Sequence, residues 1–296
     1  MKAADGYRLP SFISSTYNPR KGVHMTNDPG LCIVCHTRPK HCDSLKIHDY
    51  CSKKRAAKAA LSKTREERDA SDRSTPSPTV VPGIVEIPKS DARFESISKQ
   101  FRTSWRHKRA VPTVRAVYEV TSTSSAIAAY KVYRQSLETR ESFRSRGLAE
   151  GNEQRRWHGT KRRCLLGDPG HIELCTDPEC SLCNIIRHSY DMTHIGFAFG
   201  ASRFGRGIYT SSTSSKSDFP YTRNDGPAIT SSFKAMLLNK VAAGIGFKTL
   251  NYTPNFLAPP PGYDSVIGEA GSTLNHDELV IYRSDAIIPS YLVVYN

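Results

Sequence analysis

The chain has 296 residues, of which 38% are hydrophobic, and a formal net charge of +14. This length accommodates one large domain and a smaller module. No apolar run reaches the roughly 18 residues of a membrane span, and the amino-terminal segment lacks the apolar centre of a secretory signal. We therefore expect an intracellular protein, nuclear or cytoplasmic, with reduced thiols and no membrane partner.

The positive charge is concentrated in the first part of the chain. Residues 1–115 contain 23 Lys and Arg against 11 Asp and Glu, whereas residues 116–296 contain 19 against 17. The first part is suited to an acidic partner such as nucleic acid. The same composition also fits a solvated basic arm without a partner.

Composition divides the chain into four segments. Residues 1–30 are rich in Gly, Pro, Ser and Asn and predict an irregular segment. Residues 31–60 carry four cysteines and predict a zinc-finger-like module. Residues 61–94 are charged and then rich in Ser, Thr and Pro, which is typical of a linker. Residues 95–296 have globular patterning and predict the main domain.

Hydrophobic periodicity predicts helices first and strands afterwards in the main domain. Apolar residues recur every four positions at Ile97, Phe101 and Trp105, which indicates a helix. Residues 114–120 alternate as in a strand. Residues 124–137 show a second helical face, with Ser124 or Ser125 as the expected N-cap.

The later segments of the main domain read as strands. Three stretches, at 232–247, 277–288 and 290–296, are short, apolar, β-branched and aromatic. Helices followed by strands, without regular alternation, predict an α+β fold rather than a doubly wound sheet.

All eight cysteines fall into two clusters, each with a Cys-x-x-Cys pair, which is typical of metal sites in a reduced compartment. The second cluster has a spacing that suits a tetrahedral structural zinc site; its members are Cys164, Cys175, Cys180 and Cys183. Buried, reduced cysteines without metal are the alternative.

The first cluster resembles a small zinc finger, but Arg55 stands where that pattern has its last cysteine. Three ligands would be Cys32, Cys35 and Cys51. The fourth would be Cys42 or His48. A metal-free finger is the alternative.

Three polar segments carry residues suited to chemistry, in the order "WHGT" at 157–160, "FGRGIYTSSTSSKS" at 204–217 and "NHDELVIY" at 275–282. Together they resemble the His-Tyr-Glu signature of the poly(ADP-ribose) polymerase-like ADP-ribosyltransferases. The resemblance covers residues 95–296. It implies split antiparallel β-sheets with a helical leading segment and, between the first two motifs, the second cysteine cluster as an insertion.

The resemblance also implies a role for particular residues. His158 would hold the adenine-side ribose of NAD, and the Gly159 backbone would bind the nicotinamide carboxamide. Tyr209 would pack on the nicotinamide, Ser217 would bind the carboxamide, and Glu278 would bind the nicotinamide ribose. A carboxylate in that position stabilises the positive charge that develops on the ribose as the glycosidic bond breaks.

One position departs from the family pattern. The family has a second stacking tyrosine three residues after the serine, and this chain has Pro220 there. The rings on either side, Phe219 and Tyr221, are the candidates for the missing ring.

The resemblance predicts an enzyme that releases nicotinamide from NAD and transfers ADP-ribose to a protein or nucleic-acid acceptor. The alternative is a catalytically weak or inactive scaffold that binds nucleic acid or protein through the basic residues 1–115. The intact set of His158, Tyr209 and Glu278 favours the enzyme. The predicted co-substrate is NAD, and the predicted metal is structural zinc at one or two sites.

Overall fold

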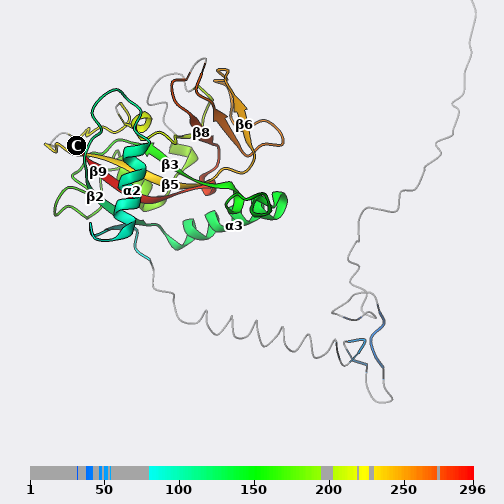
Figure 1. Cartoon of the computed structure of the whole chain (residues 1–296). Coiled ribbons are helices and arrows are strands. Elements are labelled where there is room, and N and C mark those ends of the chain that lie inside the picture. The colour runs from blue at the N-terminus through cyan, green and yellow to red at the C-terminus, as the bar shows by residue number, and fades with distance from the viewer. Residues whose placement is uncertain are drawn as a thin grey trace, which may run out of the picture. The chain divides into compact units, whose positions relative to one another are not determined.

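The chain divides into two compact units, Met1–Ser77 and Pro78–Asn296 (Figure 1). The computed structural model describes residues 80–194, 203–218, 220–226, 230–271 and 274–296, together with 32, 38–42, 47–48, 50–52 and 54. Cys35, Phe219 and most of the predicted linker lie outside the described residues.

In the first unit, Cys42 and Ile47 form an antiparallel bridge. The His48 backbone N–H donates to the His41 carbonyl over 2.8 Å. The rings of these two histidines stack with centroids 5.7 Å apart. Cys42 and His48, the alternative fourth ligands, therefore lie on two short segments that pair with each other.

The second unit contains a five-stranded antiparallel sheet. Its strand order is β1 (Gly83–Glu86), β2 (Val114–Thr121), β9 (Ile287–Tyr295), β5 (Lys234–Ala242) and β3 (Glu153–Gly159). The unit begins earlier than residue 95, the predicted boundary, because β1 pairs with β2 although its residues fall in the predicted linker.

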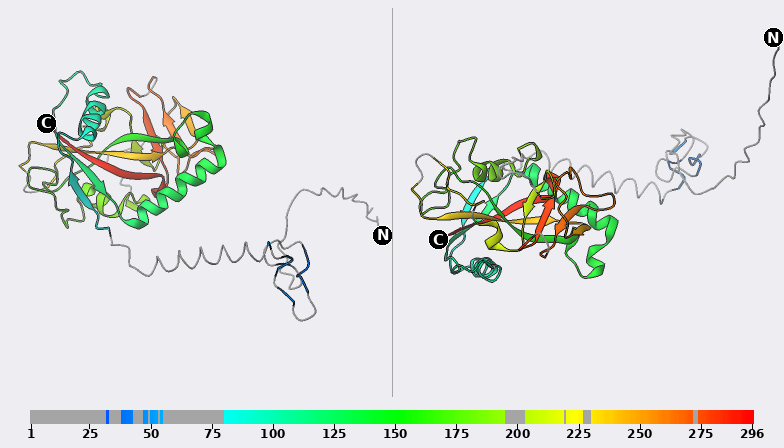
Figure 2. Two further views of the ribbon diagram at one scale, coloured as in Figure 1. Left: turned by 60° about the horizontal axis from the view of Figure 1, so that its bottom comes forward. Right: turned by 90° about the horizontal axis from the view of Figure 1, so that it is seen from above.

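A second sheet of four strands completes the unit, in the order β4 (Ile208–Thr210), β8 (Glu278–Ile281), β7 (Ser265–Gly268) and β6 (Gly246–Thr249). We expected antiparallel sheets, but the β6–β7 pair is parallel, so this sheet is mixed. Trp157 of β3 forms an antiparallel bridge with Ser211, which directly follows β4. This bridge joins the two sheets edge to edge, and Figure 2 shows both sheets from two further sides.

Three α-helices lie among the described residues: α2 (Ala92–Thr103), α3 (Ser124–Glu141) and α4 (Ser181–His188). Short 3-10 helices occupy 143–146, 150–152, 192–194, 214–217 and 284–286. The N-cap of α3 is Thr123, whose hydroxyl accepts from the Ala126 N–H over 3.2 Å, rather than Ser124 or Ser125. Helices and strands alternate along the first part of the unit, but the strands pair mainly antiparallel, which confirms the α+β fold.

The five-stranded sheet is buried on both faces because its strands alternate their side chains. On one face, Phe101 of α2 packs against Trp157 and Tyr295, with ring centroids 5.6 and 4.9 Å apart. On the other face, Leu182 and Ile186 of α4 pack with residues of β2, β5 and β9, among them Tyr118, Leu237 and Leu292. The fully buried Trp157 holds β3 against α2, and His158 is the next residue along the strand.

Helix α3 packs against residues from both sheets, including β5, β9, β4 and β8 (Figure 2). Its contact residues are Tyr130, Tyr133 and Leu137. None of the helices within the described residues combines the length and the apolar character that a bilayer crossing requires.

Candidate functional site

His158 lies near the end of β3 and is held by a backbone contact. Its Nδ1 lies 2.8 Å from the Tyr209 carbonyl oxygen. A carbonyl only accepts hydrogen bonds, so Nδ1 carries the proton and Nε2 keeps a lone pair. Burial lowers the pKa of His158 from 6.5, against the opposing effect of the Tyr209 bond. His158 is therefore a neutral, oriented acceptor, suited to bind a hydroxyl group.

Gly159 presents its backbone at the edge of β3 that faces away from β5. Trp157 exchanges backbone hydrogen bonds of 2.8 and 3.0 Å with Ser211 at this edge. Residues two apart in a strand direct their N–H and C=O groups to the same side. A Cβ on Gly159 would lie 1.9 Å from the Ser217 carbonyl oxygen and 2.8 Å from Tyr221 Cβ. Only glycine leaves room at this edge.

The Tyr209 hydroxyl forms hydrogen bonds with the loop before β4. The hydroxyl donates to the Gly205 carbonyl over 2.8 Å and accepts from the Phe204 N–H over 2.9 Å. Gly205 has φ +74, and a Cβ there would lie 1.8 Å from the Phe256 carbonyl oxygen. Because the hydroxyl is engaged, the face of the Tyr209 ring is the part of the side chain suited to a ligand.

Ser217 ends a short 3-10 helix and is buried. Its hydroxyl lies 3.1 Å from the Trp157 carbonyl and donates to it, so its oxygen keeps acceptor capacity. Tyr221 follows, with its Cβ beside Gly159. Of the two rings proposed to replace the missing tyrosine, the structure describes Tyr221 alone.

Glu278 is the first residue of β8, and its carboxylate is buried. One oxygen, Oε1, lies 2.8 Å from Lys216 Nζ. The other, Oε2, is buried and has no hydrogen-bond partner among the described residues. Burial lowers the pKa of Lys216, but the Glu278 carboxylate raises it by more, so the pKa of Lys216 is raised overall. An unpartnered buried oxygen is costly, so Oε2 is suited to a ligand donor.

Asp277, which directly precedes Glu278, has a different role. It accepts from Arg156 over 2.8 Å, from the Ser212 hydroxyl over 2.7 Å and from the Ser211 hydroxyl over 3.1 Å. These bonds tie the start of β8 to β3 and to the segment after β4. Asp277 is therefore engaged in hydrogen bonds within the fold, whereas Oε2 of Glu278 has no hydrogen-bond partner among the described residues.

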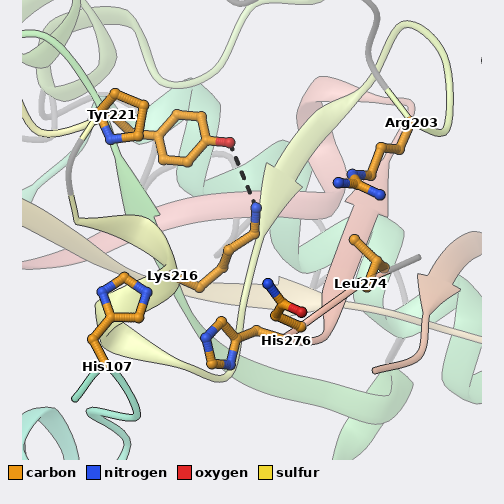
Figure 3. Close-up of a pocket in the computed structure, with 8 residues that line it drawn as sticks. His107, Arg203, Lys216, Tyr221, Leu274 and His276 are labelled. Atoms are coloured by element: carbon orange, nitrogen blue, oxygen red, sulfur yellow. Dashed lines mark hydrogen bonds between the residues drawn. The ribbon is translucent and has the colours of Figure 1, made fainter. Parts of the chain in front are cut away.

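A cavity of about 280 Å³ opens beside the Lys216–Glu278 pair (Figure 3). Figure 3 shows side chains around the Lys216 ammonium, whose 3.5 Å contact with the Tyr221 hydroxyl is dashed. The cavity is lined by His107, Arg203, Lys216, Pro220, Tyr221, Leu274, Asn275 and His276. Sequence reasoning missed most of these residues. Tyr221 was predicted as a candidate for the missing ring, Pro220 was noted at the departing position, and Lys216 directly precedes Ser217.

The basic residues around His158 are occupied within the fold. Each has an intramolecular partner: Arg156 pairs with Asp277, Lys161 with Asp225, Arg162 with Asp168 and Arg163 with Asp177, and Arg155 lies over the Tyr291 ring. The Arg162 guanidinium is almost fully buried and lies 2.7 Å from the Asp168 carboxylate. Each cation of this run therefore has a structural role within the fold.

The second cysteine cluster converges on one point. The four sulfur atoms all lie within 4.8 Å of one another; they belong to Cys164, Cys175, Cys180 and Cys183. Two sulfur separations are 3.5 and 3.9 Å. A tetrahedron of sulfurs around zinc, with Zn–S of about 2.3 Å, has edges of about 3.8 Å. The cluster could therefore bind a metal ion such as zinc.

The surroundings of this cluster suit bound thiolates. The Arg163 N–H donates to Cys180 Sγ over 3.3 Å, and the Leu166 N–H donates to Cys164 Sγ over 3.5 Å. Contacts among the thiols lower the pKa of Cys180 and raise those of Cys164 and Cys183, so Cys180 is the sulfur that most readily carries the charge. Backbone donors of this kind stabilise sulfur in its charged, metal-binding form.

The structure leaves the first cluster as a prediction. Cys32 is buried, Cys51 is half-buried and Cys42 is exposed. Cys35 lies outside the described residues, and within the described part of the chain only the second cluster forms a group of ligands that could hold a metal.

When the sequence is compared with known protein families, no family model matches it. The function must therefore be argued from the site itself.

Proposed function

We propose that the chain is an NAD-dependent ADP-ribosyltransferase with the poly(ADP-ribose) polymerase-like fold. It releases nicotinamide and transfers ADP-ribose to a protein or nucleic-acid acceptor. The observation that carries the proposal is the Glu278 carboxylate, which is buried, held by Lys216 through one oxygen and, among the described residues, unpartnered at the other.

Glu278 would act on the ribose next to the nicotinamide. Its Oε2 accepts a hydrogen bond from a ribose hydroxyl, and its charge stabilises the positive charge that grows as the glycosidic bond breaks. Lys216 fixes the carboxylate through its 2.8 Å contact, so little reorganisation is needed during the reaction.

The neighbouring residues would position the rest of the dinucleotide. Gly159 offers a backbone N–H and C=O to the planar carboxamide, which needs one acceptor and one donor. The Ser217 oxygen adds an acceptor at the same edge. His158 accepts from a hydroxyl of the second ribose through Nε2, because its Nδ1 is committed to Tyr209. Tyr209 and Tyr221 supply aromatic faces for the nicotinamide ring.

The second cysteine cluster would hold a structural zinc ion. It follows β3 directly, and its Cys180 and Cys183 pack against the same face of the sheet as α4. Four thiolates leave no open coordination position, so the ion would stabilise the insertion and would not take part in the reaction.

The experiment uses the full chain with NAD labelled in its adenylate half. Transfer of the label to the chain, to an added protein or to added nucleic acid supports the proposal. Glu278→Gln should abolish transfer, and Glu269→Gln is the matched control because Glu269 is a half-exposed glutamate paired with Lys248. A folded wild-type chain that transfers no label and releases no nicotinamide would favour the scaffold alternative.

A further inference from the structure

Tyr190 lies beside His158 in the interior of the second unit, where it is 6% exposed. The centroids of the two rings are 5.3 Å apart, and the ring planes are almost perpendicular, at 85°. Edge-to-face packing is a favoured arrangement of aromatic rings. The Tyr190 ring therefore packs directly against the imidazole that is proposed to bind the adenine-side ribose.

The hydroxyl of Tyr190 fixes its ring relative to β3. It donates to Asn239 Oδ1 over 2.9 Å, and Asn239 Nδ2 donates to the Arg156 carbonyl over 3.1 Å. Asn239 is fully buried in β5, and Arg156 lies two residues before His158 in β3. Buried polar groups are costly to leave unpaired, so these two bonds hold Tyr190 in one place beside the strand that carries His158.

The orientation of the His158 ring needs more than one contact. The bond from Nδ1 to the Tyr209 carbonyl holds one atom of the ring. A half-turn about the Cβ–Cγ bond would bring the carbon Cδ2 to that carbonyl and break the bond. The Tyr190 ring packs against the imidazole and opposes this turn. A binding side chain keeps its productive rotamer when its neighbours are packed and hydrogen-bonded in this way.

Helix α4 connects Tyr190 to the second cysteine cluster. Cys180 is the N-cap residue of the helix, and Cys183 lies in its first turn. In the last turn, the Arg187 guanidinium donates to the Cys175 carbonyl over 2.6 Å. Tyr190 follows the end of the helix by two residues. Three of the four cysteines are thus joined to the short helix that places Tyr190.

We propose that Tyr190 is a positioning residue for His158 and that the second cysteine cluster fixes the place of Tyr190 through α4. The fourth cysteine, Cys164, follows His158 by six residues. Residues 158–190 therefore close on themselves twice, at the four sulfurs and at the contact between Tyr190 and His158. The effect on NAD binding rests on the proposed function, whereas the orientation of the imidazole does not.

The first measurement is the tautomer of His158, read from the nitrogen chemical shifts of its ring by NMR of the full chain. Its signal is the one absent from His158→Gln. The wild type should show the Nδ1-protonated form alone, and Tyr190→Leu should show both tautomers. Tyr190→Phe keeps the ring and should keep the wild-type form. Tyr133→Leu is the matched control, because Tyr133 is also 6% exposed and belongs to the same hydrophobic cluster as Tyr190.

The second measurement is the affinity for a non-hydrolysable NAD analogue, compared with the same compound lacking both hydroxyls of its adenine-side ribose. The wild type should bind the complete compound about tenfold more tightly. Tyr190→Leu should bring this ratio close to one, and Tyr190→Phe and Tyr133→Leu should keep it. A general loss of folded protein weakens both compounds equally, so the ratio reports the orientation of His158.

Removal of zinc tests the connection through α4. The full chain is loaded with zinc and then treated with a chelator, and tryptophan fluorescence verifies that the second unit stays folded. The metal-free chain should show both tautomers of His158 and a reduced affinity ratio. Arg187→Gln removes the contact with the Cys175 carbonyl without changing a cysteine. It should shift the tautomers in the same direction while zinc stays bound.

Three results would overturn the role of Tyr190. These are a wild-type tautomer and affinity ratio in Tyr190→Leu, an equal change in Tyr133→Leu, and loss of the wild-type form in Tyr190→Phe. An unchanged His158 tautomer both after zinc removal and in Arg187→Gln would contradict the connection through α4. If the tautomers change as expected but the wild type binds neither NAD compound, the proposed function alone is contradicted.

Discussion

Asp277 and Glu278 are adjacent acidic residues, and the structure predicts that replacing Asp277 costs more stability than replacing Glu278. Asp277→Ala removes the partner of the Arg156 guanidinium and the acceptor for Ser211 and Ser212. Breaking a buried ion pair from one side costs about 3–5 kcal/mol. The side chains of Arg156 and Asp277 are 14% and 25% exposed, so we expect a loss of about 2–4 kcal/mol in the free energy of unfolding.

Glu278→Gln should cost less stability than Asp277→Ala. The substitution leaves the half-buried Lys216 cation without a charged partner, but glutamine retains an oxygen that can accept from Lys216, and the cost of a buried carboxylate oxygen that lacks a partner among the described residues is removed. We expect a net loss of about 1–2 kcal/mol in the free energy of unfolding.

Urea unfolding followed by tryptophan fluorescence measures both effects. The two tryptophans of the chain, Trp105 and Trp157, are both buried in the second unit, so their fluorescence reports this unit alone. An Asp277→Ala variant as stable as the wild type would refute this reasoning, as would a Glu278→Gln variant that is the less stable of the two.

Three further predictions concern the metal, the glycine and the histidine. Cys180→Ser should reduce the zinc content of the purified chain by one equivalent and lower its melting temperature; an unchanged metal content would contradict a zinc site built from the second cysteine cluster. Gly159→Ala should raise KM for NAD at least about tenfold, since its Cβ would lie 1.9 Å from the Ser217 carbonyl oxygen; an unchanged KM would remove Gly159 from the site. The folded-state pKa of His158 lies below the unfolded value of 6.5, so the unfolded chain binds the proton more readily and stability decreases as the pH falls below 6.5. Over the same acid range KM for NAD should rise as Nε2 becomes protonated, and His158→Gln should remove this dependence.

Elements with a strong local pattern were predictable from the sequence. The four-residue spacing of Ile97 and Phe101 predicted α2, and both residues are buried. Trp105 follows the same spacing but lies after the end of the helix at Thr103, where it packs against Tyr295. A periodic pattern identifies the buried face, but it does not show where the last helical hydrogen bond forms.

The sequence prediction missed a strand that depends on a partner distant in the chain. The residues of β1 are few and lie between Pro82 and Pro88, which favoured a linker. They form a strand only because β2 supplies the partner edge. The N-cap of α3 is Thr123, the residue before Ser124, and threonine is also a favoured capping residue, so the sequence alone did not place the cap.

The candidate site was predicted where motifs placed residues in a known order. The structure brings the His158 ring to the Tyr209 carbonyl across 51 residues of chain. The pairing of Lys216 with Glu278 and the approach of His107 to His276 depend on the tertiary fold. No local pattern marks a histidine that completes a cavity from a distant segment, so this part of the site required the structure.

The rate of nicotinamide release from NAD, compared between the wild type and Glu278→Gln under identical conditions, tests the central claim most directly. We predict measurable release by the wild type and a loss of at least about 30-fold in the variant, equivalent to about 2 kcal/mol of transition-state stabilisation. A folded variant that releases nicotinamide as fast as the wild type would contradict the claim.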